Sequence, residues 1–286
     1  MVHKIKAYYN IIKPGIIYGN LLSLLAGYLF ASNWHIQLLR FIYLVLGSSL
    51  VIAGACVFNN ILDRKIDSKM NRTKKRALVQ EIIKVRAAFY YGLILSIIGF
   101  LLLTQVNNKV LLLGTIGFLV YVLIYGYLKR TSTLNTIIGS ISGAIPITSG
   151  YVAVSNSFNN TSIILFLILA SWQMAHFYSI ALYRLTDYKK AGLKMAPLFK
   201  SAKSTKLEIN FYILIFGFLN LYLVSIDKSI SPLYIIIVMI VTLIWLFRNI
   251  KFSKLIKDPA WGKKSFKFSL VVLIVFSIML SLAKII

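Results

Sequence analysis

The chain has 286 residues, 59% of them hydrophobic and only 14% charged, whereas soluble domains carry roughly 25% charged residues, so an ordinary water-soluble globular fold is excluded. Its net charge of +25 would suit a nucleic-acid-binding protein, but the basic residues lie in the gaps between apolar runs, where they fit anionic lipid headgroups or substrate phosphates and not nucleic acid. The single cysteine, Cys56, excludes an intrachain disulfide and any cysteine-cluster metal site.

Nine apolar runs follow one another along the chain, each long enough to cross a bilayer as a helix of about 20 residues. The first comes after a lysine-bearing N-terminal segment and has no obvious small-residue cleavage site, so we expect it to be retained as a helix. The pattern predicts a single all-α, polytopic membrane domain over residues 1–286. In chain order the predicted crossings cover residues 14–31, 41–60, 87–105, 110–128, 134–154, 162–183, 209–225, 232–247 and 265–286.

Basic residues gather on one side of these predicted crossings. If the N-terminus lies in the cytoplasm, most of the 32 lysines and arginines fall on cytoplasmic connections, and the positive-inside rule then places the C-terminus outside. Two of the cytoplasmic connections, residues 61–86 and 184–208, are long, and long connections are often functional. The opposite face receives only Arg40, Lys109, Lys228 and Lys284.

Acidic residues are rare, and two of the seven lie just after the second crossing. Asn59, Asp63 and Asp67 are spaced four residues apart, so a helix would carry them on one face at the membrane mouth. Their carboxylate and carboxamide oxygens suit Mg²⁺, which completes its shell with water and substrate phosphates. The alternative is a surface helix with Asp–Lys and Asp–Arg pairs. Positive charge for phosphates follows at once, from Arg72, Lys74, Lys75 and Arg76.

A second polar cluster lies on the sixth crossing and its exit. It consists of His176, Tyr183 and Asp187, and offsets of 7 and 11 residues would keep them on roughly one helix face. A lone histidine inside a membrane is most often a hydrogen-bonded packing residue, but histidine is also the usual protein ligand of haem iron. Both interpretations of His176 stay open from the residues alone.

Short motifs spread along the chain carry a resemblance to a known family. They are Lys13-Pro14-Gly15-Ile16, Asn59-Asn60 with Asp63-Arg64 and Asp67, Arg72-Thr73-Lys74 with Arg76, Trp172-Gln173-Met174 with His176, and Arg184 with Asp187-Tyr188. They resemble the UbiA superfamily of intramembrane prenyltransferases, and within it the branch that attaches a farnesyl group to haem. The resemblance covers nearly the whole chain and implies a UbiA-like helical bundle. It also implies that farnesyl diphosphate and haem b are substrates and that haem o and diphosphate are products.

The resemblance implies distinct roles for the polar residues. Mg²⁺ would be the cofactor, held by Asn59, Asp63 and Asp67. Asp187 would hold it from the opposite side, and Tyr183 would join these four as a catalytic residue, because an aromatic face stabilises passing positive charge. Haem b would be a substrate rather than a cofactor. The residues that would bind the substrates are Asn60, Arg64, Arg72, Lys74, Arg76, Lys129, Arg130, His176 and Lys190.

One departure from the wider superfamily bears on the acceptor. Quinone-type members resemble one another in a second D-x-x-x-D motif, but here Ala191 lies four residues after Asp187. The haem branch resembles this chain in having Y-x-x-x-D, matched by Tyr183 and Asp187, so the departure favours haem. Two alternatives stay open: a UbiA-type enzyme acting on an aromatic quinone precursor, and an anion transporter in which the same charges bind cargo without chemistry.

Location and partners are expected to follow from the same resemblance. No long N-terminal extension precedes the first crossing, which favours the bacterial cytoplasmic (inner) membrane over an organelle. The active site is expected to face the cytoplasm, with membrane lipid around the bundle. Haem A synthase or a terminal oxidase assembly system would be the partner that receives the product.

Overall fold

The computed structural model describes residues 2–286, and every regular element within that range is a helix. Nine helical stretches among these residues are long and apolar enough to cross a membrane, which confirms the prediction of an all-α polytopic membrane protein. They are α2 (Pro14–Ser32), α3 (Leu38–Asp67), α4 (Val85–Thr104), the continuous stretch Asn108–Thr131, α7 (Asn135–Ser155), α8 (Asn160–Tyr183), α10 (Ala202–Ile226), α11 (Pro232–Phe252) and α12 (Asp258–Leu282).

The second span is longer than predicted, and a short helix, α1 (Val2–Ile11), precedes the first. α3 has 30 residues and ends at Asp67 rather than at residue 60. At 1.5 Å of rise per residue it measures about 45 Å, whereas the hydrocarbon core is about 30 Å thick, so the helix extends past the apolar layer. The N-x-x-x-D-x-x-x-D run therefore lies on one unbroken helix.

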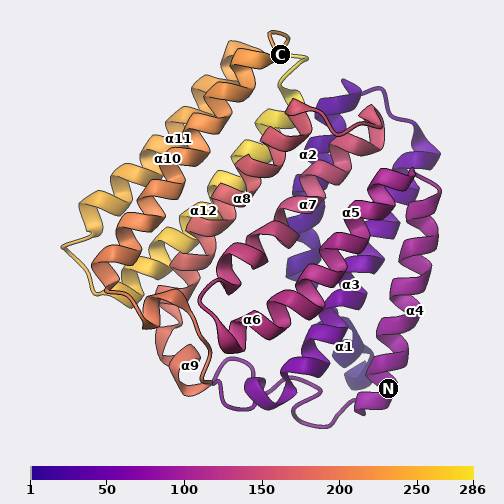
Figure 1. Cartoon of the computed structure of the whole chain (residues 1–286), viewed down its shortest axis with the longest axis vertical. Helices are drawn as coiled ribbons and strands as arrows, with labels where there is room; N and C mark the ends of the chain where they lie inside the picture. Colours follow the sequence, from indigo (N-terminus) through magenta and orange to yellow (C-terminus); the bar gives the residue numbers. More distant parts are fainter. Residues whose placement is uncertain (1) are drawn as a thin grey trace.

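Two other spans depart from regular α-helix toward one end of the bundle (Figure 1). α8 stops at Tyr183, because Arg184 leaves the helical region at φ −108° and ψ 21°, and a separate short helix, α9 (Leu185–Lys190), follows. The fourth span contains a π-helical turn, a feature that is frequent at functional sites. Its parts are α5 (Asn108–Leu119), η1 (Val120–Ile124) and α6 (Tyr125–Thr131), and the 3₁₀ turn η2 (Ala196–Leu198) lies between α9 and α10.

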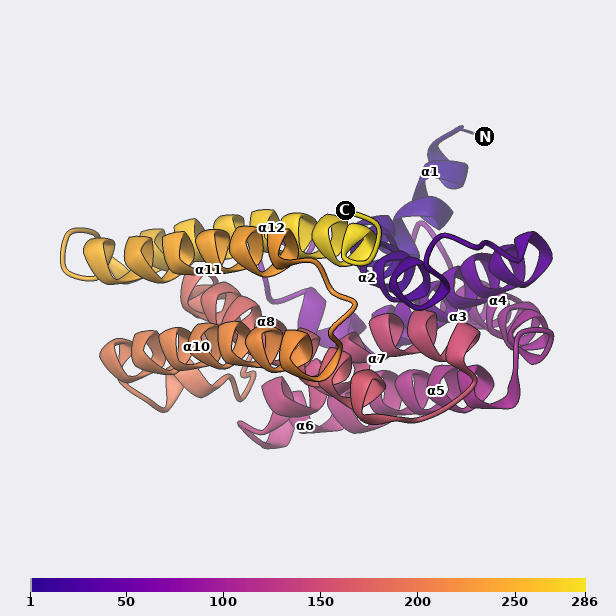
Figure 2. The same cartoon turned by 90° about the horizontal axis from the view of Figure 1, so that it is seen from above.

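The helices run roughly side by side in one bundle (Figure 1). α3, α4 and α5 form one flank and α10, α11 and α12 the other, with α2, α7 and α8 between them, as Figure 2 shows from above. α2 packs against α7 and α12, and α8 packs against α7, α10 and α12. The N-terminal helix and the C-terminus lie at opposite ends of the bundle, which agrees with an odd number of crossings.

The contact between α2 and α7 depends on a glycine. A Cβ atom built on Gly150 of α7 would lie 2.0 Å from the backbone oxygen of Leu24 on α2. Small residues at helix interfaces let two backbones approach closely inside a membrane, where no hydrophobic effect drives helices together. Gly150 therefore sets the spacing of the two central helices, both of which line the cavity described next.

Candidate active site

One cavity of about 610 Å³ opens within the bundle. Its lining comes from α2, α3, α7, α8 and α12, together with the stretch from α5 to α6, the connection after α3, and residues of α4, of α9 and of the connection after α9. Charged side chains lie where α3 ends, whereas apolar side chains such as Leu24, Val51 and Leu273 line the continuation into the bundle. Among the predicted site residues, the cavity is lined by Asn59, Asp63, Asp67, Arg72, Arg76, Lys129, His176 and Tyr183.

The two carboxylates of α3 are held by basic side chains from other segments. Asp63 forms a buried ion pair with Lys129 of α6, and its other oxygen lies 3.3 Å from Arg130 Nη2. Asp67 Oδ2 accepts a hydrogen bond of 2.6 Å from Arg76 Nη1. Guanidinium and ammonium groups are also the usual protein partners of phosphate. The predicted metal ligands thus lie among cations of the kind that bind a diphosphate.

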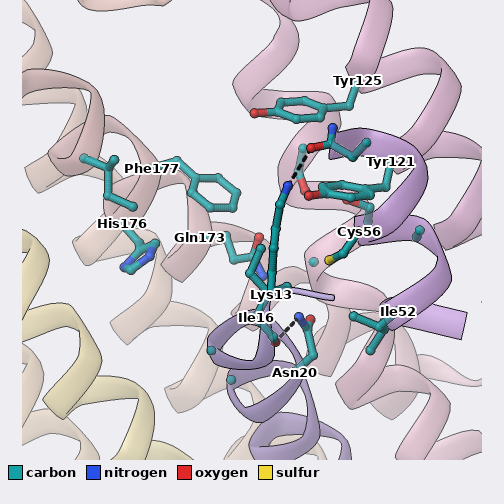
Figure 3. A pocket seen from close by; sticks show the side chains of 18 of the residues that line it. Lys13, Ile16, Asn20, Ile52, Cys56, Tyr121, Tyr125, Gln173, His176 and Phe177 are labelled. Atoms are coloured by element: carbon teal, nitrogen blue, oxygen red, sulfur yellow. Dashed lines mark hydrogen bonds between the residues drawn. The ribbon is translucent and has the colours of Figure 1, made fainter. Parts of the chain in front are cut away.

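Asn59, two turns before Asp67, is bonded by a lysine from the start of α2. Lys13 Nζ donates to Asn59 Oδ1 at 2.7 Å, and Figure 3 shows the Lys13 side chain extending into the pocket. Lys13 precedes the first residue of α2 in left-handed backbone, with a φ of 54°, and burial lowers its pKa to about 8. The buried Nδ2 atom of Asn59 has no hydrogen-bond partner among the described residues. Hydrogen bonds from the described residues therefore hold the oxygen of this amide but not its nitrogen.

The connection after α3 folds back over the end of that helix. Thr73 Oγ1 donates to the backbone oxygen of Asp67 at 2.9 Å. Arg76 Nη1 donates both to Asp67 and, at 3.0 Å, to Asn60 Oδ1. Asn60 Nδ2 in turn donates to the backbone oxygen of Ile11 at 2.7 Å. Asn60 therefore anchors α1, α3 and this connection to one another and does not line the cavity.

His176 lies farther along the same cavity, among aromatic side chains of α8 and α12. Its ring stacks on Trp172 with centroids 4.6 Å apart, and its Nδ1 lies 2.7 Å from Ser269 Oγ. Ser269 donates its only hydroxyl proton to the backbone oxygen of Phe266 at 2.6 Å, so it accepts from Nδ1–H of His176. This arrangement leaves Nε2 as the atom of the imidazole that carries a free lone pair.

Several predicted site residues do not reach the cavity. Asp187 is buried, but it lies on α9 and not on α8, so the expected common helix face with His176 and Tyr183 does not form. Within residues 2–286, no three His, Cys, Asp or Glu side chains converge on a common point. Arg64 pairs with the exposed Glu81 instead. The predicted residues outside the cavity lining are Asn60, Arg64, Lys74, Arg130, Asp187 and Lys190.

Tyr183 lines the cavity, but its ring is already close to cations. The guanidinium carbon of Arg184 lies 4.1 Å and Lys263 Nζ 5.5 Å from its ring centroid. Tyr121 and Tyr125, which belong to no motif in the sequence, line the cavity from η1 and α6 with their ring centroids 5.8 Å apart in a stacked arrangement. The π-helical turn that places them leaves no clear signal in the sequence.

Lys13 and Gln173 also line the cavity, and the sequence motifs that contain them predict no role for either side chain. The available signals were weak ones: a lysine directly before the proline that opens a span, and a carboxamide inside a membrane span. Each signal is common in membrane helices for other reasons. Only the packing of α2 against α3 and α7, and of α8 against α7, shows that both side chains reach the cavity.

The side chains at the end of α3 fit a magnesium ion. They provide two carboxylates and one carboxamide, all with oxygen donors, from one face of a helix. Mg²⁺ is usually bound through one or two protein carboxylates and completes its octahedral shell with water and substrate phosphates. The adjoining cavity leaves room for such phosphates, and Asn59 Oδ1, which accepts from Lys13 Nζ at 2.7 Å, is the amide atom that can also ligate an ion.

Comparison with known proteins assigns the fold and the family. The model of the UbiA prenyltransferase family matches residues 20–271. The chain belongs to this family. Among curated UbiA-family relatives, the protoheme IX farnesyltransferases of Klebsiella pneumoniae and Pectobacterium atrosepticum are each 41% identical to it, over 96% and 97% of this chain and 94% of theirs.

Solved structures of UbiA-type proteins share the fold. A digeranylgeranylglyceryl phosphate synthase matches with a TM-score of 0.82 at 22% identity and covers 99% of both chains. A UbiA homolog from Archaeoglobus fulgidus bound to GPP and Mg²⁺ matches with a TM-score of 0.70 at 18% identity, over 96% of this chain and 99% of that one. The UbiA-like bundle predicted from the sequence is confirmed, and the family is one of enzymes rather than anion transporters.

Proposed function

We propose that this UbiA-family chain transfers the farnesyl group of farnesyl diphosphate to a vinyl group of haem b, with addition of water, and releases haem o and diphosphate. Identity of 41% over nearly the full length of protoheme IX farnesyltransferases supports the proposal. The structural observation that carries it is a single cavity with a charged end suited to a diphosphate and an apolar, histidine-bearing part suited to haem. The position of Ala191, where a second aspartate would stand, disfavours a quinone precursor as acceptor.

The charged end is suited to the departure of diphosphate. The bond between the farnesyl carbon and the diphosphate oxygen breaks, so negative charge develops on the leaving group and must be stabilised. Mg²⁺, when bound through Asn59, Asp63 and Asp67, would neutralise part of that charge. Arg76 and Lys129 line the same end and would donate hydrogen bonds to the phosphate oxygens.

The aromatic lining is suited to the cation that remains. Tyr121 and Tyr125 lie on the cavity wall near Asp63 and its partner Lys129, and aromatic faces stabilise a desolvated cation by about 2 kcal/mol. The allylic cation bonds to the terminal carbon of the haem vinyl group, and water then captures the positive charge on the adjacent carbon. The lipid-facing helices keep other water away from the reacting carbons.

We further propose that His176 binds the haem iron through Nε2, with Ser269 fixing its tautomer. Removing such an orienting hydrogen bond typically lowers metal affinity about 10-fold to 100-fold. Ser269→Ala should therefore weaken haem binding at least about 10-fold, and His176→Leu should weaken it more, in a titration that follows the haem Soret band. Ser171→Ala, which removes a buried hydroxyl bonded only to its own helix, should bind haem like the unchanged protein. Equal affinities for haem in all three variants would contradict the proposal that His176 binds the haem iron.

The membrane topology completes the proposal. We place the N-terminus and the charged end of the cavity at the cytoplasmic face of a bacterial inner membrane, supported by the excess of basic residues on that side. Farnesyl diphosphate would then enter from the cytoplasm and haem b from the bilayer. Haem A synthase or a terminal oxidase assembly system would receive the product.

The reaction is tested with membranes that contain the protein. Incubation with haem b, farnesyl diphosphate and Mg²⁺ should give a haem whose mass corresponds to the hydroxyethylfarnesyl product. A chelator should abolish its formation, and added Mg²⁺ should restore it. Absence of any farnesylated haem, with prenylation of an aromatic quinone precursor instead, would replace haem with that acceptor.

A further inference from the structure

Gln173 has a buried amide oxygen without a partner inside the cavity. The residue lies in the middle of α8 and is only 7% exposed, and no described residue donates a hydrogen bond to Oε1. An unsatisfied buried acceptor costs about 1–3 kcal/mol, so native proteins keep few of them without a ligand or an ordered water. The amide oxygen is therefore available to a polar molecule that enters the cavity.

The Gln173 amide fills a space between α7 and α8. Gln173 precedes His176 by three residues, and Figure 3 shows the two side chains on the same side of the pocket. On α7, a Cβ atom built on Gly143 would lie 2.1 Å from both the nitrogen and the oxygen of the Gln173 amide. Gly143 thus leaves the space that the amide fills, and any other residue there would push the amide out of place.

We propose that Gln173 holds the water molecule that adds to the haem vinyl group, an inference that rests on the proposed farnesyl transfer. Once the farnesyl carbon has bonded to the terminal vinyl carbon, the adjacent carbon carries the positive charge. The amide oxygen accepts one O–H of the water, which leaves a lone pair on the water oxygen free to form the new C–O bond. The released proton passes to the diphosphate produced in the same turnover.

The chemistry of an amide suits this task. A carboxamide oxygen is a good hydrogen-bond acceptor and a very weak base, so it orients the water without removing a proton from the cation. Without an oriented water, the cation would lose a proton from the neighbouring carbon to diphosphate and form a C=C bond. The farnesylated haem would then be lighter by one water. Gln173 is thus a positioning residue that decides between hydration and elimination.

The test measures the ratio of the hydrated to the dehydrated farnesyl haem by mass spectrometry in water labelled with heavy oxygen. The unchanged enzyme should give the hydrated product with the label. In Gln173→Leu the ratio should fall about tenfold, the equivalent of one lost hydrogen bond. Gln173→Glu replaces the weakly basic amide with a carboxylate, which can take a proton from the cation, so the ratio should fall in this variant as well. Asn20→Leu is the matched amide control, because the Asn20 amide lines the same cavity but already donates to the backbone oxygen of Ile16 at 2.7 Å.

If Gln173→Leu does not accumulate, Gln173→Met is measured in its place, because the methionine side chain is nearly as long as that of glutamine. An unchanged product ratio in the apolar variants would overturn the proposal. So would an equal loss of both products, since that would assign Gln173 to the transfer step or to folding. Failure of the proposed farnesyl transfer looks different, because the unchanged enzyme would then make neither product.

Discussion

Asp63→Asn is expected to lower kcat for haem farnesylation on the order of 100-fold or more, because the leaving diphosphate loses charge stabilisation that no other residue replaces. Asp63 is one of two carboxylates at the charged end of the cavity, and it is also the buried partner of Lys129. The measurement is the initial rate of farnesylated haem formation in membranes with matched amounts of protein. Asp67→Asn should behave similarly.

The same substitution also leaves Lys129 buried without its carboxylate partner, which destabilises the fold by about 3–5 kcal/mol. Asp63→Asn combined with Lys129→Met removes that unpaired charge, so the double variant should accumulate better while staying inactive. Glu208→Gln alters an acid whose ion pair with Lys200 lies at the surface, and it should keep the unchanged rate. Normal rates in both Asp63→Asn and Asp67→Asn would contradict the metal site.

Asp187 is tested separately, because it does not line the cavity. If Asp187→Asn lowers the rate of haem farnesylation as much as Asp63→Asn does, the result supports the prediction that Asp187 is a metal ligand. An unchanged rate would confine the metal ligands to α3. Production of membrane-inserted protein is the control in both cases.

Gly150→Ala is expected to destabilise the protein by about 3 kcal/mol, although alanine is normally the better helix former by about 1 kcal/mol. The added Cβ would lie 2.0 Å from the backbone oxygen of Leu24, and a backbone atom cannot turn aside as a side chain can. α2 and α7 would have to separate. The midpoint of thermal unfolding in detergent should fall by several degrees.

Gly19→Ala is the matched control for this prediction. Gly19 lies on α2, the same helix as Leu24, and a Cβ atom there would meet no heavy atom within 4 Å. The midpoint of thermal unfolding of Gly19→Ala should stay unchanged or rise slightly, since the substitution adds helix propensity without a steric clash. A fall of equal size in Gly19→Ala and Gly150→Ala would show that close approach of α2 and α7 is not what Gly150 provides.

The spans could be predicted from the sequence because lipid imposes a simple rule. Backbone groups inside a bilayer must be bonded within their own helix, so each long apolar run can only be a helix. The row of Asn59, Asp63 and Asp67 was predictable for a related reason, since a spacing of four residues places side chains on one face of any helix. Neither inference depends on how the helices pack.

Other parts of the candidate site depend on packing and could not be read from local sequence. Asp187 was expected on the face of His176, but the helix ends at Tyr183 because Arg184 adopts a non-helical conformation. Arg64 is a predicted substrate-binding residue, and its guanidinium pairs with Glu81 of the following connection. Lys13 reaches Asn59 only because α2 is packed beside α3, 46 residues along the chain.

The sequence by itself thus determined the all-α membrane fold and the oxygen-rich face of α3, because hydropathy and helical periodicity act over a few turns of one helix. Only the tertiary structure decided which charges meet, that Lys129 and Arg76 hold the two carboxylates, and that the Gln173 amide is enclosed next to Gly143. These contacts join residues far apart in the chain, and close packing of helices rather than local propensity selects them.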